Sequence, residues 1–184
     1  MARLEGTDPE GAGLNEQKVN KEGQALTFSV NQTELEHESE EHSQAYSWST
    51  DLVDAAAVNA TILLLKNTSD VHLHIDTIYI STGSTPSEFT IHLPTVEVVV
   101  GGGATVTGVN LNTAGTPNVA DASAQSNETG NTQGDVIETV FLAVDRFIIF
   151  KTDGLVLGKN KSVGIDVVAD APETSVTIRG HYEV

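Results

Sequence analysis

The sequence predicts an all-β protein: an antiparallel β-sandwich or jelly-roll-like barrel with an extended N-terminal arm. Short runs rich in Val, Ile and Thr recur from residue 45 onward, separated by clusters of Gly, Asn, Asp and Ser. Hydrophobic residues make up 39 % of the chain but aromatic residues only 5 %, which indicates a core of many small β-branched contacts. The one helical candidate, residues 53–60, is weakened by Thr, Val and Asn around it.

Residues 1–45 form an acidic arm with ten Asp and Glu against three Lys and Arg. Its only apolar run of strand length is ALTFSV at 25–30. Two interpretations stay open: a disordered tail, or an arm that becomes ordered by lying across a neighbouring subunit. On the second interpretation, the candidate partner contacts in the arm are Leu26, Phe28 and Val30.

A single sandwich domain is expected over residues 46–184. Its first strand places Tyr46 and Trp48 on one face. Residues 87–93 alternate with Phe89 and Ile91 inward and His92 outward. Alternation or continuous apolar runs predict the full set of strands at 45–50, 60–66, 71–80, 87–93, 96–100, 105–111, 136–144, 146–152, 162–169 and 175–184.

A long surface loop is predicted near residues 101–134. The stretch 112–134 is rich in Asn, Thr, Gly, Ala and Ser and shows neither a helical period nor a long apolar run, apart from one possible helical turn around 119–125. A loop of this length is typically a contact element. Its candidate partner contacts are Asn112, Thr113, Asn127 and Asn131.

Charge and composition narrow the function classes. The net charge of −17 and the scattered distribution of nine Lys and Arg argue against direct nucleic-acid binding. The absence of Cys excludes disulfides and thiol chemistry. No apolar signal segment and no run of membrane-span length occur, so we expect synthesis in the cytoplasm and no membrane partner.

One strand face offers candidate metal ligands. His72 and His74 are two residues apart, roughly 6.5–7 Å along a strand, with Asp76 next on the same face. His92 joins them if the two strands form a hairpin. The alternative is a polar face turned to solvent or to another subunit, and it is the interpretation favoured by so short a motif.

Other chemistry is poorly supported. Asp166, Asp170 and Glu173 lie near a turn but lack the dense acidic spacing of a calcium loop. Gly101–Gly103 lacks the Lys and Ser/Thr of a phosphate loop, and no Ser lies in a nucleophile elbow. We therefore expect no catalytic residue, no cofactor and no enzymatic activity.

Several segments together resemble a known family. They are VTGVNLNTAG from Val106, SNETGNTQGDVI, LVLGKNKSVGID and VTIRGHYE, with weaker likeness in AYSWST, ATILLLKNTSD and LHIDTIYIST. With these segments the chain resembles the capsid decoration (cement) proteins of tailed phages. The arm of residues 1–45 is not part of the resemblance.

The resemblance implies a β-rich virion structural protein, a homo-oligomer and commonly a trimer, made in the host cytoplasm. It implies binding to the major capsid protein on the outer capsid surface, where neighbouring capsomers are held together. Two alternatives stay open: a head-fibre, tail-fibre or receptor-binding module of the virion, and an enzyme with a metal centre at the histidine face.

Overall fold

In the computed structural model the described residues are 5–7, 14–16, 42, 44–55, 60–96, 103–113, 118–168 and 173–183. The chain divides into two compact units, Met1–Gln32 and Thr33–Val184. In the first unit, β1 (Glu5–Thr7) pairs antiparallel with β2 (Leu14–Glu16). The arm contacts expected at Leu26, Phe28 and Val30 lie outside the described residues.

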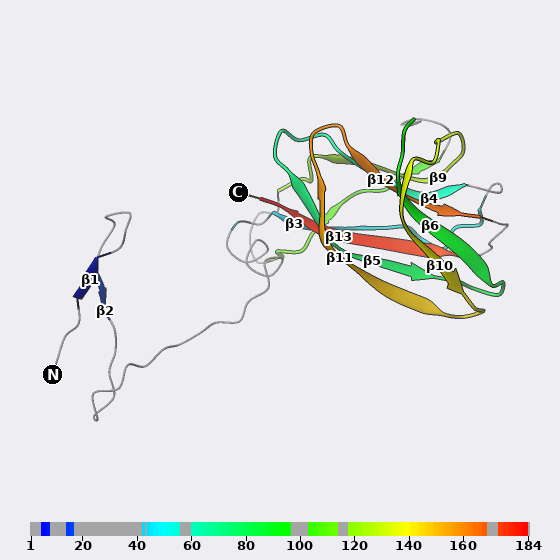
Figure 1. Ribbon diagram of the computed structural model, residues 1–184, viewed down its shortest axis with the longest axis horizontal. Coiled ribbons are helices and arrows are strands. Elements are labelled where there is room, and N and C mark those ends of the chain that lie inside the picture. Colours follow the sequence, from blue (N-terminus) through cyan, green and yellow to red (C-terminus); the bar gives the residue numbers. More distant parts are fainter. Residues whose placement is uncertain are drawn as a thin grey trace, which may run out of the picture. The chain divides into compact units, whose positions relative to one another are not determined.

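The second unit is built from two antiparallel sheets (Figure 1). One has six strands in the order β10-β6-β12-β4-β9-β7 and the other has five in the order β11-β5-β13-β3-β8. The strands are β3 (Ala45–Ser49), β4 (Thr61–Asn67), β5 (Leu73–Ser81), β6 (Ser87–Leu93), β7 (Ala104–Thr105), β8 (Val109–Asn110), β9 (Ala122–Glu128), β10 (Asp135–Leu142), β11 (Phe147–Leu157), β12 (Ser162–Val167) and β13 (Ser175–Tyr182).

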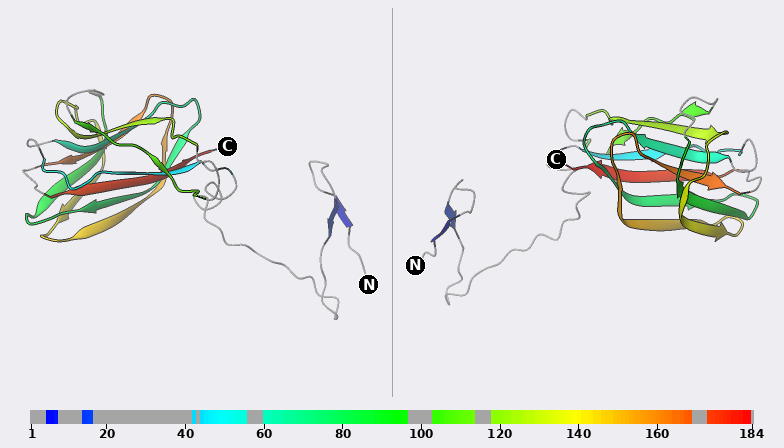
Figure 2. Two further views of the ribbon diagram at one scale, coloured as in Figure 1. Left: turned by 180° about the vertical axis from the view of Figure 1, so that it is seen from behind. Right: turned by 45° about the horizontal axis from the view of Figure 1, so that its top comes forward.

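The pairing pattern is that of a jelly roll. The run β3 to β6 pairs in reverse order with the run β10 to β13, so that β3 lies beside β13, β4 beside β12, β5 beside β11 and β6 beside β10. The additional pairs β5–β13 and β6–β12 complete two four-stranded layers. The short strands β7 and β8 and the longer β9 extend these layers at the side opposite β10 and β11 (Figure 2). The predicted all-β class and its jelly-roll form are confirmed.

The core lies between the two sheets and draws on both. Tyr46 and Trp48 of β3 are buried in it as predicted, and so are Phe89 and Ile91 of β6. The continuous apolar run of β4 is buried along its whole length except at Lys66. Small β-branched and aliphatic side chains fill most of the remaining space, as the low aromatic content predicts.

The expected long loop contains a strand of the six-stranded sheet. β9 pairs with β4 over six residue pairs, from Thr61 opposite Glu128 to Asn67 opposite Ala122. Its buried positions carry Ala124, Ser126 and Glu128, small or polar residues that give no apolar signal in the sequence. The expected helical turn around 119–125 is therefore wrong, because most of that stretch belongs to this strand.

Candidate interaction surfaces

The five-stranded sheet turns a hydroxyl-rich face without carboxylates away from the core. The inward side chains alternate with these positions, as Ile78 and Ile178 show by their complete burial. The cross-strand register places twelve outward residues in three rows, which we call the neutral face: Phe147, Ser81 and Ser175; Ile149, Tyr79, Thr177 and Ser49; Lys151, Thr77, Arg179, Ser47 and Val109. None of the twelve is Asp or Glu, in a chain with 26 acidic residues.

Side chains at the centre of the neutral face hold one another in place. The Arg179 guanidinium lies 5.1 Å from the Tyr79 ring centroid, and its Nη1 donates to the Tyr79 hydroxyl at 3.4 Å. The hydroxyls of Ser49 and Thr177 are hydrogen-bonded at 2.7 Å, as are those of Ser81 and Ser175. These contacts fix a flat, pre-arranged surface rather than a set of independent polar tips.

Two carboxylates lie at the other end of this face, and each is paired with a histidine. Asp76 Oδ2 lies 3.0 Å from His181 Nδ1, and Glu183 Oε2 lies 3.3 Å from His74 Nε2. The two imidazole rings stack at a centroid distance of 5.1 Å. His74 is therefore engaged with Glu183 and His181, whereas the exposed His72 precedes the strand.

The structure does not bring the candidate metal ligands His72, His74 and His92 together. His92 lies on β6 in the six-stranded sheet and His74 on β5 in the five-stranded sheet, because β5 and β6 do not form a hairpin. Over the part of the chain that the structure describes, no group of three His, Asp or Glu side chains is arranged to hold a metal ion. Of the calcium candidates, Asp166 belongs to a buried network, Glu173 is exposed, and Asp170 lies outside the described residues.

Exposed apolar side chains concentrate on β10 and β11, the adjacent edge strands of the two sheets (Figure 1). Seven of the twelve large apolar residues exposed in the described chain lie between residues 136 and 156. The β10 part of this set is called the β10 rim here. It consists of Val136 (54 % exposed), Ile137 (38 %), Phe141 (69 %) and, in the following turn, Val144 (42 %).

The six-stranded sheet differs because part of its outer face, around Thr61 and His92, is covered by the chain itself. The connection 129–134, which we call the crossover, joins β9 on one side of the sheet to β10 on the other. The crossover forms a bridge between Thr132 and Val96, and Gly134 N–H faces His92 Nδ1 at 3.4 Å. Outward residues beneath it are consequently buried; Thr61 and His92 are both 0 % exposed.

A polar network lies under the crossover. Asn131 Nδ2 donates to Thr61 Oγ1 at 3.0 Å, and Thr61 Oγ1 donates to Asp166 Oδ1 at 2.6 Å. Asp166 Oδ2 lies 3.0 Å from His92 Nε2, at an angle that falls short of a good hydrogen bond. His92 was correctly predicted to point outward, but the crossover encloses it. The network stabilises the fold rather than presenting groups to a ligand.

One glycine allows His92 to occupy this position. A Cβ on Gly164 of β12 would lie 2.8 Å from His92 Nε2, so any larger residue would displace the ring. The imidazole thus lies across the neighbouring strand, where the absence of a side chain makes room for it. Gly164 was not singled out by the sequence, because a glycine inside a β-branched run carries no mark of the side chain that crosses it.

The loop residues expected to contact partners have different environments. Asn131 belongs to the buried network, and Asn127, in a left-handed conformation with φ of 56°, donates to Asp54 O at 3.1 Å. Asn112 is half-buried, and its N–H donates to Asn110 Oδ1 at 2.8 Å within a turn. Thr113 is exposed. Asn127 and Asn131 therefore have a structural role in addition to any contact.

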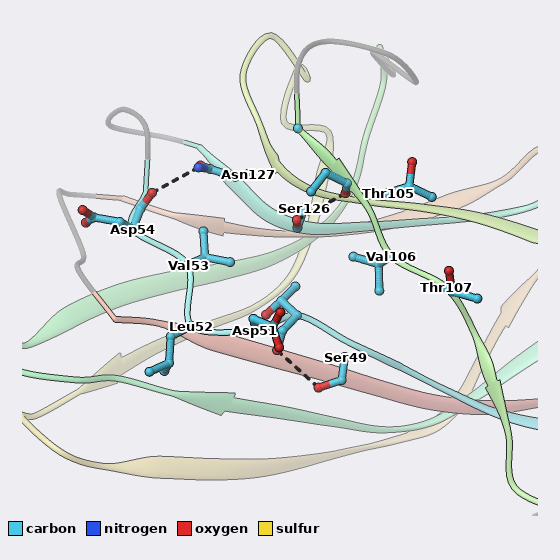
Figure 3. Close-up of a pocket in the computed structure, with 13 residues that line it drawn as sticks. Ser49, Asp51, Leu52, Val53, Asp54, Thr105, Val106, Thr107, Ser126 and Asn127 are labelled. Carbon is cyan, nitrogen blue, oxygen red and sulfur yellow. Dashed lines mark hydrogen bonds between the residues drawn. The ribbon is translucent and has the colours of Figure 1, made fainter.

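An open cavity of about 580 Å³ lies between the segment after β3 and the segment around β7 (Figure 3). Val53 and Val106 flank it from opposite sides, and Asp51 and Asp54 are exposed at its border. Its described lining contains no His, Cys, Lys or Arg. The polar side chains of the lining are hydroxyls such as Ser49 and Ser126, the two carboxylates and the Asn127 amide.

Two tyrosines in the core are perturbed by their surroundings. Burial raises the pKa of Tyr182, and the nearby Asp121 and Tyr46 act in the same direction. Burial also raises the pKa of Tyr46, against a lowering effect of its hydrogen bond with Asn110. The two rings meet edge to face at 5.8 Å. Both hydroxyls are kept in the neutral form by their position in the core.

No family model, curated protein or solved structure matches this chain. Among the described residues, no helix has the length and apolar character needed to cross a bilayer. The neutral face and the β10 rim are therefore the features from which a function can be inferred.

Proposed function

We propose that this protein is a capsid decoration protein of a tailed phage, which binds the outer surface of the major capsid protein and stabilises contacts between neighbouring capsomers. The observation that carries the proposal is the concentration of exposed apolar side chains on the two edge strands, with Phe141 69 % exposed. An exposed apolar patch on one side of a β domain fits docking on another protein surface. The segments quoted above that resemble the family support the same function.

The β10 rim suits capsid contact for a second reason. Its side chains project from the outer strand of the sheet, which has no further partner strand among the described residues, and an extended segment of a partner could pair with this edge. Phe141 and Glu88 are cross-strand neighbours on the outward side, so the rim combines an aromatic anchor with a polar border. An aromatic side chain within a polar border is typical of a binding surface.

The test is the binding of the purified full-length protein to capsids that lack it. We expect saturable binding with a copy number on the order of the number of capsomers. Phe141→Asp should weaken binding at least about tenfold, since it places a charge where an apolar contact is required. Val119→Asp is the matched control, because Val119 is also highly exposed but lies far from the rim in sequence and on the β9 side.

Two results would overturn the proposal. One is failure of the unmodified protein to bind capsids. The other is a copy number of a handful per particle, which would favour the fibre or receptor-binding alternative. Equal losses of capsid binding in Phe141→Asp and Val119→Asp would show that the β10 rim is not the contact surface.

A further inference from the structure

We propose that the neutral face of the five-stranded sheet is the surface through which two copies of this chain contact each other. The inference rests on the proposed function in one respect: a virion protein that forms oligomers needs a surface for contact with its own copies. The face is defined above by its twelve outward residues, centred on Tyr79, Thr177 and Arg179.

Charge selects this face for self-association. Each copy carries a net charge of −17, so two copies repel unless the contact keeps carboxylates apart. One pair of like charges at 4 Å costs about 1 kcal/mol in water and about 4 kcal/mol at a partly buried site. The neutral face contains no carboxylate, and its two cations, Lys151 and Arg179, must be offset from the same residues of the second copy. A basic partner, in contrast, would be attracted to the acidic surfaces rather than to this one.

The composition of the face is that of a protein interface. Tyr, Phe and Arg are enriched in such interfaces and Asp and Glu are depleted. The Tyr79–Arg179 stack lies in the middle, while Phe147 (71 % exposed) and Ile149 (49 %) extend the surface toward the edge strand. A partner therefore meets an aromatic and guanidinium centre that is already ordered, which lowers the entropy lost on binding.

Burying the hydroxyls of this face costs little. Ser49 and Thr177 are bonded to each other, and so are Ser81 and Ser175, so each pair already has one hydrogen bond that does not depend on water. Polar groups buried without a partner would instead cost about 1–3 kcal/mol each. Within each pair, only one O–H group therefore still needs an acceptor from the second protein surface or from water.

The outer faces of the two sheets differ in how far the chain covers them. The crossover covers the part of the six-stranded sheet around Thr61 and His92, which are both completely buried. On the five-stranded sheet, Arg179, Phe147 and Ile149 remain exposed. A second copy placed there would give this sheet the cover that the crossover gives the other.

The experiment measures association of the full chain by sedimentation over a wide protein concentration range. Thr177→Glu adds a carboxylate at the centre of the face, and Ser49→Glu does so at an exposed position with less risk to folding. Thr105→Glu is the matched control, an exposed strand residue of the six-stranded sheet. We expect the first two variants to raise the dissociation constant of self-association at least about tenfold, and we expect the control to leave it unchanged.

Salt separates self-association from binding of an acidic partner. The screening length falls from about 10 Å at 0.1 M salt to about 3 Å at 1 M, which reduces repulsion between two acidic copies. Association through the neutral face should therefore strengthen with salt, whereas pairing of Lys151 and Arg179 with foreign carboxylates should weaken. A circular-dichroism melt of each variant verifies that it is folded.

A monomer at every concentration would overturn the inference, as would equal effects of Thr177→Glu, Ser49→Glu and Thr105→Glu, or association that weakens with salt. Capsid binding is scored separately. Self-association without capsid binding would reject the proposed function and keep this inference. Capsid binding by a protein that stays monomeric would keep the proposed function and reject this inference.

Discussion

Replacing Asp166 with Asn tests whether the polar network under the crossover stabilises the fold. Asp166 is 5 % exposed and accepts from Thr61 Oγ1 at 2.6 Å, while its second oxygen lies 3.0 Å from His92 Nε2. The N–H of Gly134 faces His92 Nδ1, so a neutral His92 ring carries its proton on Nε2, close to the carboxylate but poorly aligned with it.

An amide of the same shape cannot serve both neighbours. If the oxygen of the introduced amide accepts from Thr61, its NH₂ group confronts the Nε2–H of His92, and two donors are opposed in a site closed to solvent. A hydrogen bond to a charged group contributes about 1.5–3 kcal/mol, and a buried donor left without an acceptor costs about 1–3 kcal/mol. We therefore expect Asp166→Asn to lower the free energy of unfolding by about 2–4 kcal/mol.

The assay is equilibrium unfolding in urea, with thermal melting as a second probe. A loss of about 3 kcal/mol corresponds to a fall of about 6–12 °C in Tm for a protein of this size. Asp135→Asn, at the exposed first residue of β10, is the control and should change stability by less than about 0.5 kcal/mol. If Asp166→Asn stays within that same limit, the network contributes nothing to stability and the reasoning is refuted.

Two further predictions follow from the core. Gly164→Ala should destabilise the protein by about 1–3 kcal/mol, because its Cβ would lie 2.8 Å from His92 Nε2, whereas Gly158→Ala meets nothing within 4 Å; equal unfolding midpoints in urea would contradict this. Alkaline pH should destabilise the fold, since burial raises the pKa of Tyr182 and Tyr46 above the value of about 10 in the unfolded chain. The unfolded state then loses these protons first, so stability is intact below about pH 9 and falls as pH rises past about 10. Tyr182→Phe should make Tm less dependent on pH in this range, and an unchanged alkaline slope would exclude Tyr182 as a cause.

Strand positions were predictable from the sequence, whereas their assignment to sheets was not. The predicted runs at 60–66 and 87–93 coincide closely with β4 and β6, because apolar continuity and alternation directly reflect burial. Consecutive strands from β3 to β6 belong alternately to the two sheets. The residues of a single strand do not indicate which of the two sheets the strand joins. For that reason the sequence left open whether His92 joins His74, and the structure places the two histidines in different sheets.

The two features missed by sequence reasoning are unusual strands. β9 buries Ala, Ser and Glu instead of β-branched residues, so its composition is that of a loop. In β5 an irregularity beside Arg179 and Gly180 changes the alternation, and the inward positions run from Leu73 and Ile75 to Ile78 and Ile80. A register shift of this kind depends on the neighbouring strand and cannot be located from one segment alone.

The jelly-roll pairing also constrains when the fold can close during synthesis. β13, which follows all the other described strands in the sequence, lies in the middle of the five-stranded sheet between β5 and β3, the first described strand of the sandwich. Pairs so distant in sequence form late and slowly, because a long loop must be ordered before the contact is gained. Until β13 has left the ribosome, β3 and β5 have no strand between them. The sandwich is thus completed from its C-terminal end, by insertion of a central strand.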